Sequence, residues 1–489
     1  MRLTLRLDPQ RLRNWHLRLA QRLTRHAGVR LGVEWAKTNE NLPPALSLLF
    51  ALERLIHGLP SNDAVASAEP KCFARYSAQN QDGADLVIDF TGSVPRPGER
   101  TWHVAFDGLS GEAAALGALI QGRTPLVAIV DASTGIEIAA GHPGTETNGI
   151  LVLAFQDVLA RTTTLIDSTL NGVTPRLAAE PRRTIPINLK SMGRFAVRSL
   201  PRAIAGRLYH LCYNAPHWRV GWRFVDGPDV IDLRAHPVGG WRELPDDRHR
   251  FYADPFPFVV EGRTYLFVED FEHRLGRGVI SMIEFEGVGP VGTPRPVLET
   301  NHHLSYPFVF GHNNEIWMVP ESCTTETIDL YRAAPFPDRW VKEATLVSGL
   351  AASDATLLEH GGRWWMLATV RDDGGAYSDT LCIWSSPEIS GPWKPHRKNP
   401  LLIDIAGARS AGRIVRRNGK LIRPVQDCRN GYGSALGLAE ITQLDDDGFA
   451  QCVETVLRPG ALWPGRRLHT LNRAERLECI DGSALSRKF

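Results

Sequence analysis

The sequence predicts two domains of different class, an α/β domain followed by a five-bladed β-propeller. The chain has 489 residues, which is more than one ordinary hydrophobic core can organise. Residues 1–170 alternate short apolar runs with helix-like segments, whereas residues 218–489 repeat a pattern of strand, turn and strand. Residues 171–217 lie between them and are basic and proline-rich, which is typical of a linker.

The N-terminal region begins with a strand-like stretch at residues 3–7. A helix is expected from about residue 9 to residue 26, with Gly28 as its C-terminal cap. The later apolar runs "VRLGVEW", "ADLVIDF", "TWHVAFDG" and "TPLVAIV" are separated by segments such as "ALSLLFALERLIHGL" and "GEAAALGALIQG". This alternation predicts a parallel sheet flanked by helices, a Rossmann-like arrangement. No G-x-G-x-x-G sequence follows the first strand, so we expect no nicotinamide or flavin cofactor.

Two strand ends of this domain, "DLVIDFTG" and "TWHVAFDG", resemble those of the N-terminal half of formyltransferases. In that family an Asn, a His and an Asp converge on the transferred carbon, and the His lies in a segment that continues to Leu-Pro and Gly. His103 is the corresponding histidine, but no such segment follows it. We therefore expect a formyltransferase-like fold in which His103 is structural and lacks the partnered Asn and Asp of formyl transfer.

The linker is rich in arginine and contains a single acid, Glu180. Prolines 175, 181, 186 and 201 are expected to break it, leaving one or two amphipathic helices. A basic amphipathic helix at residues 188–213 would be able to lie on an anionic membrane surface. The alternative is a helical strut that fastens the two domains together, and this is the interpretation we favour.

Composition excludes several classes of function. A net charge of +2 gives no general attraction to nucleic acid, so no nucleic-acid partner is expected. The seven cysteines never form a CxxC pair, which argues against both a disulfide framework and a zinc ribbon. We find neither a signal peptide nor an apolar run of the roughly 18 residues that a membrane-spanning helix needs. These features predict a cytoplasmic protein, with the inner face of the membrane as the alternative location.

The C-terminal region contains five copies of one pattern. Each copy has a small or polar opening, a short apolar strand, a turn rich in Gly or Asn, and a second strand. Their spacing of about 50 to 58 residues is that of β-propeller blades. The copies are "YADPFPFVVEGRTYLFVEDF", "SYPFVFGHNNEIWMVPES", "SDATLLEHGGRWWMLATV", "SAGRIVRRNGKLIRPVQD" and, in degenerate form, "LHTLNRAERLECIDG".

The opening residues of these copies predict a site. The innermost strands of a propeller line a central funnel, so residues at the start of each copy converge at one mouth although they are far apart in the sequence. A ring of acids, a phenol, a guanidinium and an imidazole is better explained by a binding or catalytic site than by strand-end packing. The residues at these equivalent or nearby positions are Asp254, Tyr306, Asp354, Arg409 and His469.

These five segments resemble the propeller region of plant glucosamine inositolphosphorylceramide transferases and their bacterial relatives. Through them the chain is similar to the five-bladed glycoside hydrolase family 43. The resemblance covers residues 218–489, and the bacterial relatives also share the preceding α/β half. The plant proteins carry a separate glycosyltransferase domain that this sequence does not contain.

The family 43 resemblance implies that Asp254 is a general base and that Asp354 orients and tunes its partner. The general acid of those hydrolases is a glutamate in a Glu-Gly-Pro setting, which is missing here. Glu321, in "VPES", is the candidate third catalytic carboxylate, and Glu269, in "FVED", is a candidate for substrate binding.

The fourth copy carries arginines that suit a phosphate-linked sugar donor. Guanidinium groups bind phosphate through two parallel hydrogen bonds, and a transferase needs one base together with cations for the departing phosphate. We expect a glycosyltransferase of polysaccharide or glycolipid biosynthesis that binds a sugar donor and a carbohydrate or lipid-linked acceptor, without a cofactor or a metal. The alternatives are a hydrolase or phosphorylase of the family 43 type and a non-catalytic sugar-binding module. The expected substrate-binding residues of this copy are Arg409, Arg423, Gln426, Asp427 and Tyr432.

Overall fold

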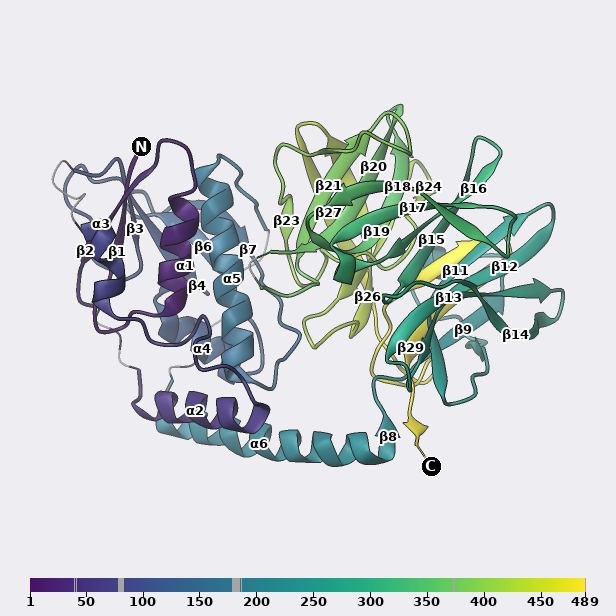
Figure 1. Ribbon diagram of the computed structural model, residues 1–489, viewed down its shortest axis with the longest axis horizontal. Helices are drawn as coiled ribbons and strands as arrows, with labels where there is room; N and C mark the ends of the chain where they lie inside the picture. The colour runs from purple at the N-terminus through teal and green to yellow at the C-terminus, as the bar shows by residue number, and fades with distance from the viewer. Residues whose placement is uncertain are drawn as a thin grey trace. The chain divides into compact units, whose positions relative to one another are not determined.

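The computed structural model describes residues 1–38, 40, 42–77, 83–177, 185, 187–372 and 374–488. The chain folds as two compact units (Figure 1). The α/β unit comprises Met1–Ile204 with the short segments Asp372–Ala376 and Leu402–Asp404. The propeller unit comprises Ala205–Arg371, Tyr377–Leu401 and Ile405–Phe489. Within the described residues, no helix is both long and apolar enough to cross a membrane.

The sheet of the α/β unit is mixed. Its strand order is β2-β1-β3-β4-β6-β7, with β5 paired to β4. The first four strands pair in parallel as expected, but β6 and β7 run antiparallel, so the prediction of a fully parallel sheet is wrong at this edge. The cause lies partly in the tight turn after β6, where Asp131 accepts hydrogen bonds from the backbone N–H groups of Ser133 and Thr134, because a link this short can only return the chain antiparallel. The strands are β1 (Arg2–Leu7), β2 (Arg30–Trp35), β3 (Leu86–Asp89), β4 (Thr101–Phe106), β5 (Leu109–Ser110), β6 (Val127–Asp131) and β7 (Glu137–Gly141).

The helices of this unit share one core with the sheet. The first is shorter than expected, because a turn in which the side chain of Asp8 accepts from the backbone N–H of Gln10 precedes it and Thr24 ends it before Gly28. The second ends at Gly58, whose φ of 63° lies in the left-handed region that favours glycine. The helices are α1 (Asn14–Leu23), α2 (Ala45–His57), the 3₁₀ turn Pro70–Phe73, α3 (Ala74–Ser77), α4 (Glu112–Ile120) and α5 (Leu151–Leu170).

The linker contains one long helix, α6 (Leu189–Cys212). Pro201 lies inside this helix, so the expectation that it would break the linker is wrong. A proline in a helix interior removes one backbone hydrogen bond and strains the preceding turn, and burial of Met192 and Phe195 against the α/β core holds the N-terminal half of the helix in place. Residues 178–184 and 186, which include Glu180 and two of the predicted helix-breaking prolines, lie outside the described residues.

The propeller has five blades, as predicted. Four of them are sheets of consecutive antiparallel strands. Blade one contains β11 (Arg250–Val260), β12 (Arg263–Glu272), β13 (Arg277–Glu286) and β14 (Gly289–Leu298). Blade two contains β15 (Ser305–His312), β16 (Glu315–Glu321), β17 (Thr327–Ala333) and β18 (Trp340–Ser348). Blade three contains β19 (Ala351–His360), β20 (Arg363–Arg371), β21 (Thr380–Ser386), β22 (Lys394–Pro395) and β23 (Leu402–Ile403). Blade four contains β24 (Val415–Arg417), β25 (Lys420–Asp427), β26 (Ala435–Asp445) and β27 (Gly448–Leu457).

Blade five closes the propeller by joining its two ends. Its strand order is β10-β9-β29-β28, so strands from before blade one pair with strands from after blade four. The central pairing is antiparallel and runs from Leu477 opposite Phe224 to Ser483 opposite Trp218. This explains why the fifth sequence copy is degenerate: only half of the blade comes from it. The strands are β9 (Trp218–Phe224), β10 (Arg242–Glu243), β28 (Leu471–Ala474) and β29 (Leu477–Ser483); the short strands β8 (Tyr213–Asn214) and β30 (Ser486–Arg487) pair with each other, and α7 (Val230–Leu233) follows β9.

Candidate functional site

The first three blades share an unusual backbone feature at the start of their inner strands. Asp254, Tyr306 and Asp354 have φ values of 48°, 44° and 54°, in the left-handed region that side chains other than glycine seldom adopt. In each blade the strand register shifts at this residue, which marks a β-bulge. The repeat alignment therefore predicted three structurally equivalent positions. Backbone conformations of this kind cost about 1–3 kcal/mol each and are concentrated at functional sites.

Asp254 is almost completely buried and is held by its neighbours. Its carboxylate accepts hydrogen bonds from the hydroxyl of Thr470 at 2.9 Å and from the backbone N–H of Tyr306 at 3.2 Å. Burial raises the pKa of Asp254 to about 6; the positive charge of His469 opposes this shift and the carboxylate of Asp481 adds to it. At neutral pH Asp254 is thus an ionised carboxylate with a basicity suited to accepting a proton.

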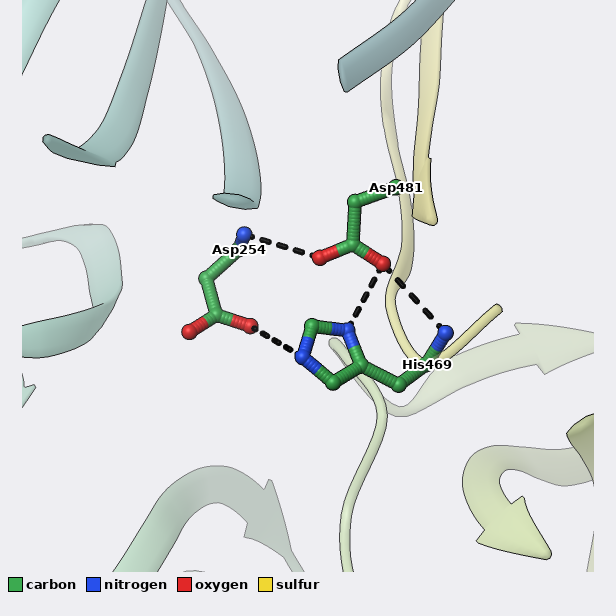
Figure 2. A group of neighbouring side chains, drawn as sticks. All are labelled: Asp254, His469 and Asp481. Atoms are coloured by element: carbon green, nitrogen blue, oxygen red, sulfur yellow. Dashed lines mark hydrogen bonds and ion pairs between the residues drawn. The ribbon is translucent and has the colours of Figure 1, made fainter. Parts of the chain in front are cut away.

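His469 lies between Asp254 and a second carboxylate, Asp481 (Figure 2). Its Nδ1 is 2.7 Å from Oδ1 of Asp481, and its Nε2 is 3.9 Å from Oδ1 of Asp254. Asp481 also accepts the backbone N–H of Asp254 at 2.9 Å, so it fixes both residues. Burial lowers the pKa of His469, but the two carboxylates outweigh this effect and the net pKa is raised. Trp218 stacks on the imidazole with ring centres 4.0 Å apart and fixes its plane.

The same three residues have the chemistry of a metal site. One ligand atom from each of Asp254, His469 and Asp481 lies within 4.8 Å of the others. In this structure the three residues form a chain of carboxylate, imidazole and carboxylate, joined by a hydrogen bond to Asp481 and an ion pair to Asp254. A metal at this position would need the neutral imidazole.

Asp354 is joined to Arg409 from the next blade. Nε of Arg409 donates to Oδ2 of Asp354 at 2.7 Å, Nη2 lies 3.3 Å from Oδ1, and Nη2 also reaches Oε2 of Glu321 at 3.4 Å. The remaining nitrogen, Nη1, donates to the carbonyl of Tyr377 at 3.4 Å. Each of the three nitrogens of Arg409 therefore has a protein partner, which suits a residue that orients Asp354.

Glu321 and Gln426 complete the surroundings of Asp354. Oε2 of Glu321 accepts the backbone N–H of Asp354 at 3.3 Å, and the side-chain amide of Gln426 donates to Oδ2 of Asp354 at 2.9 Å. Burial raises the pKa of Asp354 to about 7, against the opposing charge of Arg409. Because Glu321 is already engaged with Arg409 and with the backbone, its geometry is that of a support for Asp354.

Glu269 is the carboxylate with the fewest partners. It lies opposite Ala253 on the neighbouring strand of blade one, and its Oε1 is 3.5 Å from Nε2 of His303. Burial holds the pKa of Glu269 well above its usual range, and the charges of Asp254 and Glu321 add to this effect. The surroundings of Glu269 therefore favour its protonated form more than those of an exposed glutamate do. Asp254 and Glu269 are thus neighbouring buried carboxyl groups with raised pKa values, the kind of pair from which acid and base roles are assigned.

The funnel is closed beneath these carboxylates. The phenol of Tyr306 lies 2.9 Å from the hydroxyl of Thr356 and accepts the backbone N–H of Gly412 at 2.9 Å, so it links three blades. Thr356 follows Asp354 in blade three, and Gly412 follows Arg409 in blade four. Arg413 adds to the plug by donating to the carbonyl of Val309 at 2.6 Å. The buried Tyr306 is compatible both with a non-catalytic sugar-binding module and with a shallow catalytic site at the mouth.

Of the other residues predicted in blade four, one lies in the cluster and two lie outside it. Tyr432 joins the cluster: its hydroxyl is 3.5 Å from Nη2 of Arg409 and its ring contacts His469 edge-on. Arg423 is fully buried and donates to the carbonyls of Gly407 and Ala408, so it is engaged with backbone. Asp427 pairs with Arg429 at 2.7 Å. The contacts of Arg423 and Asp427 are those of residues that stabilise the blade.

Sequence reasoning missed Asp481, Thr470 and Trp218. Asp481 lies near the end of the second strand of the fifth copy, just as Glu269 lies near and Glu321 at the end of the second strand of its copy. Comparing these second-strand ends, in addition to the strand openings, would have identified it. Trp218 carries no such signal, because it belongs to the strand that closes blade five from the other end of the propeller.

His103 in the α/β unit has a carboxylate partner. Its Nε2 is 3.2 Å from Oδ2 of the buried Asp89, and that hydrogen bond, with the negative charge, raises the pKa of His103. Asp89 in turn accepts the hydroxyl and the backbone N–H of Thr91. These contacts form a local hydrogen-bonded turn at the strand end, which agrees with a structural role for His103. That His103 lacks the partnered Asn and Asp of formyl transfer stays a prediction.

Comparison with known proteins confirms the resemblance of the propeller. Residues 245–481 match the family described as "Glucosamine inositolphosphorylceramide transferase 1, N-terminal". A protein of that name from Arabidopsis thaliana is 32% identical over 250 residues, which cover 48% of this chain and 32% of the relative. The protein of the same name from Oryza sativa subsp. japonica is 32% identical over 239 residues, covering 45% of this chain and 31% of the relative. The chain therefore spans about a third of the length of the curated relatives it matches.

Solved structures similar to this chain include glycoside hydrolases. A thermostable family-43 glycoside hydrolase matches 44% of this chain and 78% of its own, with 11% sequence identity and a TM-score of 0.33. A family 117 glycoside hydrolase from Zobellia galactanivorans matches 56% of this chain and 92% of its own, with 11% identity and a TM-score of 0.36.

Proposed function

We propose that the chain is a glycosyltransferase that acts at the mouth of its propeller. The observation that carries this proposal is the pair of neighbouring buried carboxyl groups Asp254 and Glu269, in a cluster whose other acids are engaged by Arg409 or by His469. Removing several carboxylates from water costs several kcal/mol for each ion. A surface that only binds neutral sugars does not need this arrangement.

The reaction we propose needs one base. The proton of an acceptor hydroxyl passes to Asp254 while the hydroxyl oxygen bonds to the anomeric carbon of the donor. The bond from that carbon to the donor phosphate breaks, and the phosphate leaves with the electron pair. Phosphate is a stable anion and needs no proton to leave, so a single ionised carboxylate is sufficient for transfer.

One observation favours a glycoside hydrolase as the second candidate. A leaving sugar hydroxyl must receive a proton, and burial raises the pKa of Glu269, which favours its protonated form. The two candidates therefore make different demands on Glu269. Transfer from a phosphate donor does not use its proton, whereas hydrolysis of a glycoside does.

Turnover of two variants distinguishes the candidates. The full chain is incubated with a panel of nucleoside-diphosphate sugars and lipid acceptors, and separately with nitrophenyl glycosides that have little need of acid assistance and with alkyl glycosides that require it. For a transferase, Asp254→Asn should lose about 10²- to 10⁴-fold in transfer rate, while Glu269→Gln stays within about tenfold of the wild type. Loss of alkyl-glycoside hydrolysis in both variants would establish the hydrolase instead. Sugar binding without turnover of any substrate would establish the binding module. Asp226→Asn, which changes an exposed carboxylate of the same unit, is the matched control.

The acceptor we propose is lipid-linked. The relatives' name includes inositolphosphorylceramide, and the chain offers a surface suited to lipid. The outer face of α2 is apolar, with Leu48, Leu52 and Leu55 exposed. On α6, Leu189 and Val197 are exposed beside Arg194 and Arg198, and the helix contains no acid. Exposed leucines beside uncompensated arginines favour an anionic lipid surface.

A further inference from the structure

A large cavity of the propeller unit lies beside Trp218, outside the carboxylate cluster. It has a volume of about 850 Å³, which is within the range of small-molecule sites. Residues from β9, from the segment before blade one and from both sides of β28 and β29 form its walls. The ionisable residues among them are His217, Arg219, Glu243, Asp246, Arg248, Arg466 and Arg467.

The acids of this cavity are already paired. Glu243 forms an ion pair with Arg219, and Oδ2 of Asp246 lies 3.3 Å from Nε2 of His217. The structure gives no ion pair for the guanidinium groups of Arg248, Arg466 or Arg467 in the described part of the chain. The cavity thus presents three arginines with unmet capacity for an anion.

The cavity shares a wall with the candidate catalytic cluster. Arg467 lies over Trp218, 5.6 Å from the ring centre, and Trp218 stacks on His469. Arg467 also lies 5.9 Å from the ring centre of Tyr432, whose hydroxyl meets Arg409. An anion held by Arg467 would therefore lie one aromatic ring away from the imidazole that faces Asp254.

We propose that this cavity binds the phosphate groups of a substrate, with Arg248, Arg466 and Arg467 as the ligands. The inference rests on the proposed function and deepens it: the donor phosphate would be held here, since each nitrogen of Arg409 already has a protein partner. Planar guanidinium groups bind phosphate through paired hydrogen bonds. The chemistry is that of a phosphate ester, supplied either by a nucleoside-diphosphate donor or by a phosphoinositol headgroup.

Binding of small probes to the full chain tests the site without requiring turnover. Inorganic pyrophosphate, uridine diphosphate and inositol 1-phosphate are titrated by calorimetry into the wild type and into Arg466→Gln/Arg467→Gln. We expect pyrophosphate to bind the wild type and its Kd to rise at least tenfold in the double variant. Arg339→Gln is the matched control, because Arg339 is an exposed arginine of blade two outside the cavity. Preference for uridine diphosphate identifies the donor as the source, and preference for inositol 1-phosphate identifies the headgroup.

The outcomes separate this inference from the proposed function. Equal affinity in the double variant and the wild type, or no binding of any probe by the wild type, would overturn the cavity assignment. If the double variant keeps transfer with an unchanged KM, the cavity assignment fails while the glycosyltransferase stands. If pyrophosphate binds and the variant weakens it, but no donor is ever turned over, the site stands and the proposed reaction fails. Arg248→Gln provides a second test on a different segment of the wall.

Discussion

Asp254 combines three costs in a single residue. Its backbone is in the left-handed region, its carboxylate is buried, and further carboxylates surround it. Thr470, His469 and the backbone of Tyr306 offset part of this cost. A side chain maintained against such costs is held in a reactive state, and this is the physical case for assigning it the role of base.

The pKa of Asp254 predicts opposite effects of pH on stability and on activity. An unfolded aspartate titrates near 3.9 and the folded one at about 6, so the folded state binds the proton more tightly. Stability from this residue is present below about pH 4 and is lost as the pH rises through 6, by about 1–3 kcal/mol. Activity should rise over the same interval, because the base must be ionised. Urea unfolding of Asp254→Asn and of the wild type at pH 4 and pH 7 measures the first effect. The free energy of unfolding of the variant, relative to that of the wild type, should be higher at pH 7 than at pH 4. An equal difference at both pH values would show that Asp254 has an ordinary pKa.

Replacing Arg409 tests its role in orienting Asp354. Lysine keeps the charge but cannot bond Asp354 and Glu321 together as the guanidinium does. Arg409→Lys should therefore lower the free energy of unfolding by about 1–3 kcal/mol, because buried acceptors lose partners. Arg295→Lys, at an exposed ion pair, should change it by less than about 0.5 kcal/mol. If Arg409→Lys is as stable as the wild type but binds pyrophosphate more weakly, Arg409 binds phosphate, as predicted from the sequence.

Much of the cluster was predictable from equivalent positions in the repeats. Asp254, Tyr306 and Asp354 open the first three copies, and each lies at a bulge in the same position of its blade. Arg409 and His469 lie beside Asp354 and Asp254. The roles of Arg423 and Asp427 were not predictable, because their contacts depend on the irregular chain before β24 and on Arg429. A sequence shows which residues occur near a strand end, but not which neighbouring carbonyl or arginine reaches them first.

At the scale of elements, α2 and α6 combine to predict membrane association. Both pack inner residues on the α/β core and leave apolar residues outside, with Leu55 80% and Val197 74% exposed. The full chain should co-float with vesicles containing phosphatidylserine and not with neutral phosphatidylcholine vesicles, and binding should fall as salt is raised.

Two variants separate the parts of this surface. Arg194→Gln/Arg198→Gln should reduce binding to anionic vesicles, since each basic residue contributes about 1 kcal/mol. Leu48→Ser/Leu55→Ser should reduce it without changing the salt dependence. Equal flotation of both variants and the wild type would favour the strut interpretation of α6, in which the helix only connects the two units.

The sequence pattern was wrong about the direction of one pair of strands and the length of one helix, and both are determined by hydrogen bonds in neighbouring turns. The antiparallel pairing of β7 with β6 depends on the turn in which Asp131 accepts backbone hydrogen bonds. The late start of α1 depends on the turn at Asp8. Apolar periodicity predicted that these strands and this helix exist, because burial determines existence. It could not predict direction or exact length, which single hydrogen bonds at the ends determine.

At the scale of the whole molecule, the closure of blade five holds the propeller together. Trp463 packs against glycines on the two strands that meet there: a Cβ on Gly221 would lie 2.7 Å from its ring, and one on Gly482 would lie 2.4 Å from Nε1. Gly482→Ala should therefore destabilise the propeller by several kcal/mol. Hydrogen exchange read peptide by peptide should show faster exchange in the blades and unchanged exchange in β1 and α5. Gly287→Ala is the control, because a Cβ there meets no atom within 4 Å.

The closure of blade five also determines when the candidate site is completed during synthesis of the chain. Domains form largely in the order in which they leave the ribosome, and the α/β unit draws most of its residues from the first 204. The strand that binds β9, and with it Asp481, is translated more than 250 residues later. Until then β9 has an open edge and Asp254 lacks the carboxylate that fixes its backbone and its histidine. The nascent propeller therefore lacks the complete cluster of Asp254, His469 and Asp481 until its last blade has been translated.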